Sequence, residues 1–184
     1  MTVFQSIVLG VIQGLTEFLP VSSSGHLVLF KAFFAVTEVP ILFDVILHVS
    51  TLVVVIIVFR KAVGQILRSL GRWIVRRSDD SDAESLRVAW VILLATVVTG
   101  AMGVFIGELG VNRYPNVVSI LFIVTGLVLV ATRFVHPTGS YRDIGVKTAL
   151  ITGFLQGLGV FPGISRSGIT IAGSLFSGLR REQA

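Results

Sequence analysis

The sequence contains no cysteine and few charged residues. The absence of Cys among its 184 residues excludes a disulfide framework and any thiolate-bound zinc or iron–sulfur centre. Charged residues make up 14% of the chain, whereas a soluble domain carries about 25%. With 53% hydrophobic residues and a mean hydropathy of +0.91, a water-soluble globule could not cover its surface with polar groups. We therefore expect a polytopic membrane protein.

The net charge of +5 does not indicate a nucleic-acid partner. Seven of the 15 basic residues fall in one segment, 60–87, between two apolar runs. Because loops rich in Lys and Arg stay on the cytoplasmic side, this cluster predicts a cytoplasmic loop over 60–87. The N-terminus has no basic n-region and no small-residue cleavage site, so we expect it to belong to the mature fold.

Three apolar stretches are long enough to cross a bilayer, which takes about 20 helical residues. They cover residues 41–59, 88–107 and 117–135. Alternation from the cytoplasmic loop places residues 108–115 outside. It places residues 133–147, with three further cations, inside.

Two further apolar segments end in polar breaks that contain Pro and Gly. Residues 1–19 meet the break PVSSSGH at 20–26, and residues 146–161 meet PGISRSG at 162–168. Only about ten apolar residues follow each break, too few to span the bilayer, so we expect re-entrant half-helices. Broken backbone at membrane depth is tolerated where it is buried in protein or lines a wet cavity.

The two breaks are copies of one another. A shift of 143 positions without a gap gives seven identities in thirteen positions. Three spans, an odd number, separate the copies, so the first copy should enter from outside and the second from inside. We therefore predict an all-α integral membrane protein with a single domain over 1–184. It would be an inverted-topology repeat with two re-entrant helix pairs, 1–36 and 146–179, and three transmembrane helices within 41–135.

Ionisable groups flank both breaks. Glu17 precedes the first break and Arg166 lies inside the second; each would cost about 2.5–3.5 kcal/mol at membrane depth without a partner or a function. Gly and Ser permit close backbone approach, exposed N–H groups bind anions, and a guanidinium matches phosphate oxygens. Glu17 and His26 could shuttle protons or hold a divalent ion. The sequence thus favours a site for an anionic headgroup.

Structural interpretations compete with this one. Glu17 could cap a helix or pair with Arg166, and the small residues of the breaks could serve helix packing. Asp44 and His48 lie four residues apart at the head of a span. They could be catalytic, but we favour an ion pair with a structural role.

The segments around the breaks closely resemble the two signature motifs of the bacitracin-resistance (BacA/UppP) family of undecaprenyl-diphosphate phosphatases. These segments are 13–26 (QGLTEFLPVSSSGH) and 161–168 (FPGISRSG), and 43–48 (FDVILH) is also similar to the family. The resemblance implies a multi-pass enzyme of the bacterial plasma membrane, with its active site accessible from the outer side. It would hydrolyse undecaprenyl diphosphate with a divalent cation, Mg or Ca, to recycle the lipid carrier for peptidoglycan synthesis and confer bacitracin resistance.

The motif match also implies roles for individual residues. Ser23 is the candidate nucleophile and His26 a rival nucleophile or acid/base. Glu17 fits a metal ligand or base, and Arg166 a phosphate clamp. The remaining motif residues would shape the substrate pocket; they are Gln13, Ser22, Ser24, Gly25, Gly163, Ser165, Ser167 and Gly168. The family has Glu or Gln where this chain has Gln13.

Other functions remain open at this point. The inverted repeat is also typical of transporters, so a polyprenyl-phosphate flippase is an alternative, and a structural membrane subunit is a third. The expected partners are undecaprenyl diphosphate and membrane lipids, with a homodimer among the alternatives for the oligomeric state. Relatives in the family continue with further membrane helices, so the chain resembles a fragment.

Overall fold

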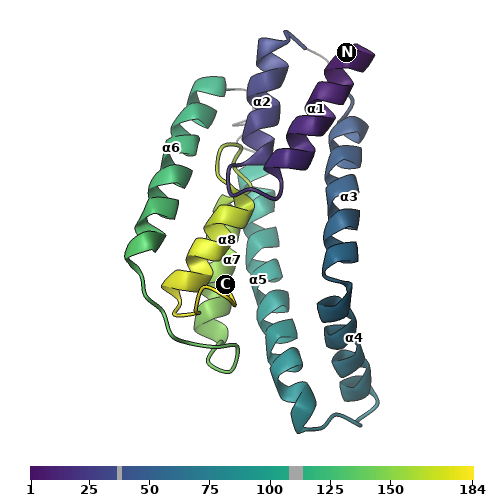
Figure 1. The fold of residues 1–184 in the computed structure, drawn as a ribbon, viewed down its shortest axis with the longest axis vertical. Coiled ribbons are helices and arrows are strands. Elements are labelled where there is room, and N and C mark those ends of the chain that lie inside the picture. Colours follow the sequence, from purple (N-terminus) through teal and green to yellow (C-terminus); the bar gives the residue numbers. More distant parts are fainter. Residues whose placement is uncertain (37–38, 108–113) are drawn as a thin grey trace.

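The computed structural model describes residues 1–36, 39–107 and 114–184, and these ranges are helical with connecting turns (Figure 1). The helices are α1 (Val3–Thr16), α2 (Ser23–Phe33), α3 (Ile41–Val58), α4 (Arg60–Ile74), α5 (Ala83–Gly107), α6 (Pro115–Ala131), α7 (Val146–Leu158) and α8 (Arg166–Phe176). Short 3₁₀ turns occupy Asp80–Asp82 and Thr132–Phe134. Gly139 and Leu179 form an isolated parallel β-bridge within the described residues.

Three of the helices are long and apolar enough to cross a membrane. They are Ile41–Val58, Asp80–Gly107 and Pro115–Phe134, which include α3, α5 and α6. Their outward faces carry exposed large apolar side chains such as Ile57, Val104 and Leu127. Exposure of so many apolar side chains is unfavourable in water but not in lipid. The prediction of three spans in a multi-pass membrane protein is confirmed. Most of the connection between α5 and α6, predicted to face outward, lies outside the described residues.

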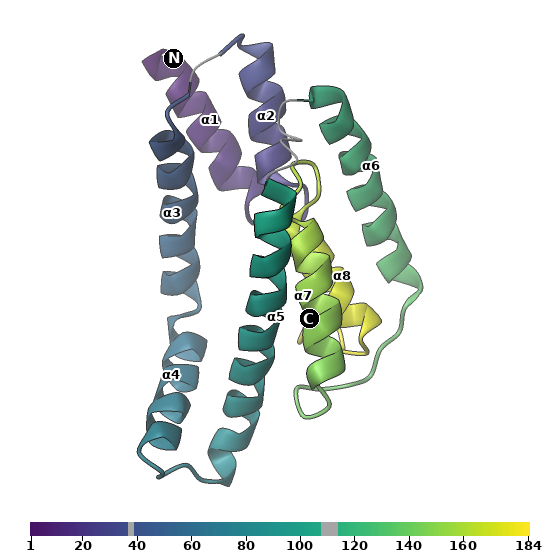
Figure 2. The ribbon, with the colours of Figure 1, turned by 180° about the vertical axis from the view of Figure 1, so that it is seen from behind.

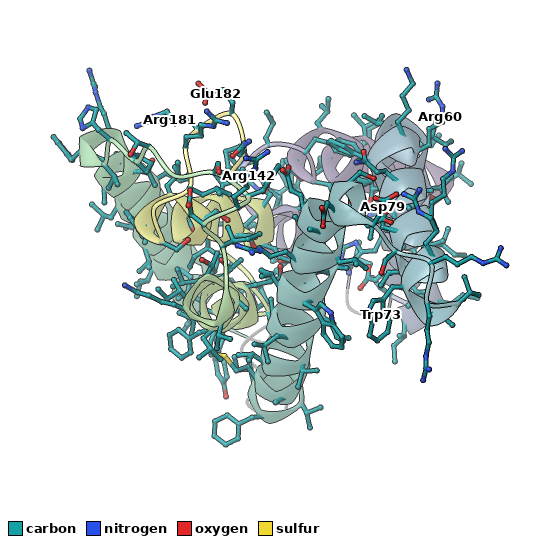
Figure 3. The ribbon with its side chains drawn as sticks, turned by 90° about the horizontal axis from the view of Figure 1, so that it is seen from below. Arg60, Trp73, Asp79, Arg142, Arg181 and Glu182 are labelled. Atoms are coloured by element: carbon teal, nitrogen blue, oxygen red, sulfur yellow. The ribbon has the colours of Figure 1, made fainter. Side chains whose placement is uncertain are left out.

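The basic segment expected to be a loop over 60–87 is mostly helical. Apolar residues recur in α4 every three or four positions, which is the period of an amphipathic helix; they are Val63, Leu67, Leu70 and Ile74. The buried carboxylate of Asp82 accepts hydrogen bonds from Ser69 (2.6 Å) and from Arg72, and so joins α4 to the start of α5. Seen from below, Arg60 and Asp79 lie on the α4 side, and Arg142 and Arg181 on the side of α7 and α8 (Figure 3).

Two helical hairpins approach each other from opposite ends of the structure. The α1–α2 hairpin enters from one end and the α7–α8 hairpin from the other, and their turns meet in the middle (Figures 1 and 2). The backbone N–H of Gly163 donates to Ser22 Oγ across this junction (3.0 Å), and the Ser167 hydroxyl donates to the Leu19 carbonyl (3.4 Å). The bounds of α8 are those of α2 shifted by the 143 positions of the sequence repeat.

Small residues fix the second hairpin against α5. A Cβ added to Gly153 on α7 would lie 2.8 Å from the Ala95 Cα, and one added to Gly157 would lie 2.4 Å from the Met102 sulfur. The Thr99 hydroxyl donates to the Gly153 carbonyl (3.0 Å) across the same interface. This close backbone approach is typical of helix pairs in membranes. It fixes the position of α7, and of the turn that follows it, along α5.

Candidate active site

The first turn is built around Ser22, whose backbone is strained. With φ of 61° and ψ of 87°, Ser22 occupies the left-handed region, which costs a non-glycine residue free energy. Its hydroxyl accepts two backbone N–H groups, one from Gly25 that caps α2 (3.3 Å) and one from Gly163 of the other hairpin. Gly163 itself has φ of 99°. Ser22 therefore caps its own helix and joins the two turns at the same time.

The second turn repeats this cap with an added support from α6. Ser165 Oγ accepts the N–H of Gly168 (3.1 Å) at the start of α8, as Ser22 does at the start of α2. The Thr125 hydroxyl accepts the N–H of Ser165 (3.1 Å) and donates to the carbonyl of Gly163 (2.9 Å). Both Thr125 and Ser165 are buried. Thr125 was not among the predicted residues, because only the packing of α6 against α8 brings it to the turn.

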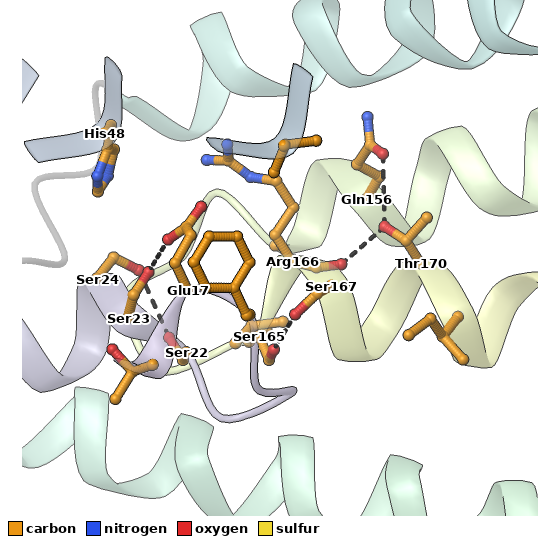
Figure 4. A pocket seen from close by; sticks show the side chains of 16 residues that line it. Glu17, Ser22, Ser23, Ser24, His48, Gln156, Ser165, Arg166, Ser167 and Thr170 are labelled. Carbon is orange, nitrogen blue, oxygen red and sulfur yellow. Dashed lines mark hydrogen bonds between the residues drawn. The ribbon is translucent and has the colours of Figure 1, made fainter. Parts of the chain in front are cut away.

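One cavity of about 400 Å³ lies between the two turns (Figure 4). Among the predicted site residues, Glu17, Ser22, Ser23, Ser24, Ser165, Arg166 and Ser167 line it. Ser23 and Arg166 are the first residues of α2 and α8, so the N-termini of both helices reach this cavity. Unpaired N–H groups and the helix dipole make a helix N-terminus a site for anions, and here two such ends converge.

Glu17 and Ser23 form a hydrogen-bonded pair on one side of this cavity. The Ser23 hydroxyl donates to Glu17 Oε2, and the Gln13 amide donates to the same oxygen at 2.9 Å. Arg166 extends into the cavity from the other hairpin (Figure 4). Within the described ranges, no salt bridge joins Glu17 to Arg166 and no hydrogen bond uses the Arg166 guanidinium. The two charges are therefore available to a ligand between them.

Five of the predicted residues are not among those that line the cavity. The His26 ring packs edge-on against Phe122 with centroids 4.9 Å apart, and its Nδ1 lies 2.8 Å from the Ser22 carbonyl oxygen. The other four are Gln13, Gly25, Gly163 and Gly168. A Cβ on Gly25 would lie 2.7 Å from the Gly163 nitrogen. Gly25 thus allows the turns to meet, and His26 is turned toward α6.

The expected Asp44–His48 ion pair is replaced by two other contacts. Both Asp44 carboxylate oxygens accept from Lys31 of α2 at 2.7 Å. The His48 ring instead lies with Nδ1 2.8 Å from Gln13 Nε2 and lines the cavity.

Two cavity residues that the sequence analysis missed belong to the second hairpin. Gln156 and Thr170 line the cavity and lie together, with the Thr170 hydroxyl 3.4 Å from Gln156 Oε1. Gln156 is the repeat equivalent of Gln13, so the repeat itself carried a signal for it. Thr170 carried none in the sequence.

The donor set suits a hard cation completed by substrate oxygens. The described residues contain no cluster of three or more His, Cys, Asp or Glu side chains that could hold a metal, and Glu17 is the one carboxylate among the residues that line the cavity. Mg²⁺ is commonly bound through one or two carboxylates, water and substrate phosphates. One carboxylate beside several hydroxyls, facing an anion site, fits that pattern.

Comparison with known proteins assigns the family. The family model described as "Bacitracin resistance protein BacA" matches residues 6–184. The chain belongs to the BacA family. Relatives named undecaprenyl-diphosphatase include those of Treponema denticola, 46% identical over all of this chain and 68% of the relative, and Desulfosudis oleivorans, 45% identical over 98% of this chain and 69% of the relative. That of Desulforapulum autotrophicum is 41% identical over all of this chain and 70% of the relative.

The role of Thr125 in this BacA-family site can be tested by Thr125→Val. The change keeps the shape but leaves the Ser165 N–H and the Gly163 carbonyl without their partner. We expect the free energy of unfolding in detergent micelles to fall by about 1–3 kcal/mol, the cost of unpaired buried polar groups. Thr96→Val is the control, because the exposed Thr96 hydroxyl bonds only to its own helix. Equal effects of the two changes would contradict the assigned support.

Proposed function

We propose that this BacA-family chain hydrolyses undecaprenyl diphosphate to undecaprenyl phosphate and inorganic phosphate. The observation that carries this proposal is the shared cavity, in which the Ser23–Glu17 pair faces Arg166 between two helix N-termini. Phosphoryl transfer depends mostly on positioning and on stabilising charge on the phosphoryl oxygens. A guanidinium and two converging helix ends supply that stabilisation. The relatives named undecaprenyl-diphosphatase support the choice of substrate.

The contacts favour Ser23 over His26 as the nucleophile. Ser23 already donates its hydroxyl hydrogen to Glu17, whereas the His26 ring lies against Phe122 and does not line the cavity. In the proposed step, the Ser23 oxygen attacks the terminal phosphorus while its proton passes to Glu17. The bond from phosphorus to the bridging oxygen breaks, and undecaprenyl phosphate leaves. Water then attacks the phosphorus of the phosphoserine, the bond from phosphorus to Ser23 Oγ breaks, and Glu17 returns its proton to that oxygen, which releases phosphate and restores the hydroxyl.

A divalent cation, Mg or Ca, is part of the proposal. Glu17 would hold it together with phosphate oxygens of the substrate, and the cation would supply charge neutralisation of the diphosphate. Arg166 and the two helix ends would act on the same phosphate oxygens. The hydroxyls of Ser24 and Ser167, which line the cavity, would orient them.

We also propose that the two hairpins are re-entrant elements of an inverted repeat. Their equivalent bounds, their opposite directions in Figure 1 and the three spanning helices between them support this arrangement. The basic segment 60–87 favours a cytoplasmic position for α4, so the first hairpin would enter from the outer side of the bacterial plasma membrane. The cavity would then open to lipid headgroups on that side, where the enzyme recycles the carrier for peptidoglycan synthesis.

Substitution of Ser23 and Arg166 tests the site. We expect Ser23→Ala and Arg166→Ala each to lower phosphate release from undecaprenyl diphosphate by at least about 10²-fold, the effect of one lost charge-stabilising group. Ser119→Ala and Arg133→Ala are matched controls, since both residues are exposed and lie outside the cavity. Near-normal rates in both site variants would overturn the assignment. Movement of undecaprenyl phosphate between the leaflets of proteoliposomes without phosphate release would instead favour a flippase.

Chelation tests the cation. We expect EDTA to abolish phosphate release and added Mg²⁺ or Ca²⁺ to restore it, because Arg166 alone among the described Lys and Arg residues lines the cavity and cannot neutralise a diphosphate beside the negative charge of Glu17. Glu17→Gln should lower the rate and weaken the dependence on the cation concentration. Full activity in EDTA would show that Arg166 and the helix ends suffice.

A further inference from the structure

The hydrogen bonds around Glu17 continue through the buried Gln13 to His48 on α3, whose ring also lines the cavity. Gln13 on α1 is 1% exposed, and its Nε2 lies 2.9 Å from Glu17 Oε2 and 2.8 Å from His48 Nδ1. Glu17 in turn accepts from Ser23. Four side chains from three helices and a turn thus form one hydrogen-bonded series, from His48 through Gln13 and Glu17 to Ser23.

The directions of these hydrogen bonds follow from the chemistry of the groups. A carboxylate only accepts, so the atom of Gln13 that faces Glu17 is the amide nitrogen. That nitrogen only donates, so His48 Nδ1 accepts, and the proton of the neutral ring sits on Nε2. Both amide hydrogens of Gln13 are then used, one by each neighbour.

The carbonyl oxygen of Gln13 has no role in fixing the side chain. Gln13 Oε1 is buried and has no hydrogen-bond partner in the described part of the chain. The orientation of the amide is therefore set by the two acceptors of its nitrogen. Without the acceptor on His48, a buried N–H would lose its partner, and rotation of the amide would turn a carbonyl oxygen toward the Glu17 carboxylate.

We propose that His48 is a positioning residue of the phosphatase site. Through Gln13, it holds the Glu17 carboxylate in place to accept the hydrogen of Ser23. This inference rests on the proposed function for its catalytic consequence, but its hydrogen bond can be observed independently. This role for His48 stands in place of the structural Asp44–His48 ion pair that the sequence analysis favoured.

Kinetics of His48 variants test the proposal with full-length chain in detergent and undecaprenyl diphosphate as substrate. We expect His48→Leu to lower kcat about 10-fold, the scale of a buried donor left unpaired, with KM within about twofold because the phosphate-binding groups are untouched. His48→Asn offers a carbonyl oxygen near the position of Nδ1 and should recover most of the rate. His136→Leu makes the same change at an exposed histidine outside the cavity and should leave the rate unchanged.

A double-mutant cycle separates positioning from general destabilisation. If His48 acts through Gln13, His48→Leu should lower kcat no further in a Gln13→Leu background. A full additional loss in that background would overturn the proposal. So would a His48→Leu rate within about twofold of the wild type, or a His48→Asn variant as impaired as His48→Leu.

Nitrogen NMR gives a readout that does not depend on catalysis. The chain has 3 histidines, so ¹⁵N-histidine labelling gives few signals to assign. We expect neutral His48 to carry its proton on Nε2, and this preference to weaken in Gln13→Leu. A proton on Nδ1 in the wild type would contradict the proposal. A wild type that releases no phosphate would count against the proposed function. The NMR spectrum would still show whether His48 Nδ1 accepts the hydrogen bond from Gln13.

Discussion

The hydroxyl of Ser22 joins the two halves of the site. It accepts one N–H from its own helix and one from Gly163, 141 residues further along the chain. The strained left-handed backbone of Ser22 aims that hydroxyl at the second turn, and Gly25 and Gly163 allow the two backbones to approach without a Cβ between them. Glu17, Ser23 and Arg166, which line the cavity, lie in or directly beside these two turns.

The two copies of the repeat share a backbone design but carry different chemistry. Ser22 and Ser165 make the same cap, 143 positions apart. At the next position the first copy has Ser23 and the second has Arg166, and Glu17 has Val160 as its equivalent. The hydroxyl and the carboxylate thus come from one hairpin and the guanidinium from the other. Because like elements meet head to head, the positive ends of both helices reach the same cavity.

The sequence was most informative where a pattern is local. Run length and composition predicted the three spans, and the repeat predicted two equivalent broken segments. The residue types at the breaks singled out Glu17, Ser23 and Arg166, which the structure brings to one cavity. The period of apolar residues in α4 was also present in the sequence, but the dense positive charge of the segment led to a prediction of a loop.

Features that depend on contacts between distant helices could not be predicted. The His26 ring packs against Phe122 on α6 and does not line the cavity. The Asp44 carboxylate accepts a hydrogen bond from Lys31 on α2 and forms no ion pair with His48. Thr125 has no motif around it and acquires its role only because α6 passes behind the second turn. In each case the contact partner lies on another helix, and the sequence spacing between the two residues does not predict that they meet.

The most direct measurement of the central claim is a disulfide across the junction of the turns. Pro20 Cβ lies 3.1 Å from the position of a Cβ on Gly168, close to the spacing of about 3.5–4.5 Å in disulfides, and the chain has no cysteine to interfere. If the turns meet, Pro20→Cys with Gly168→Cys should form an intramolecular disulfide in the membrane under mild oxidation, detected by mass spectrometry. Two free thiols after oxidation, as expected for a Gly14→Cys and Gly126→Cys pair, would contradict the account.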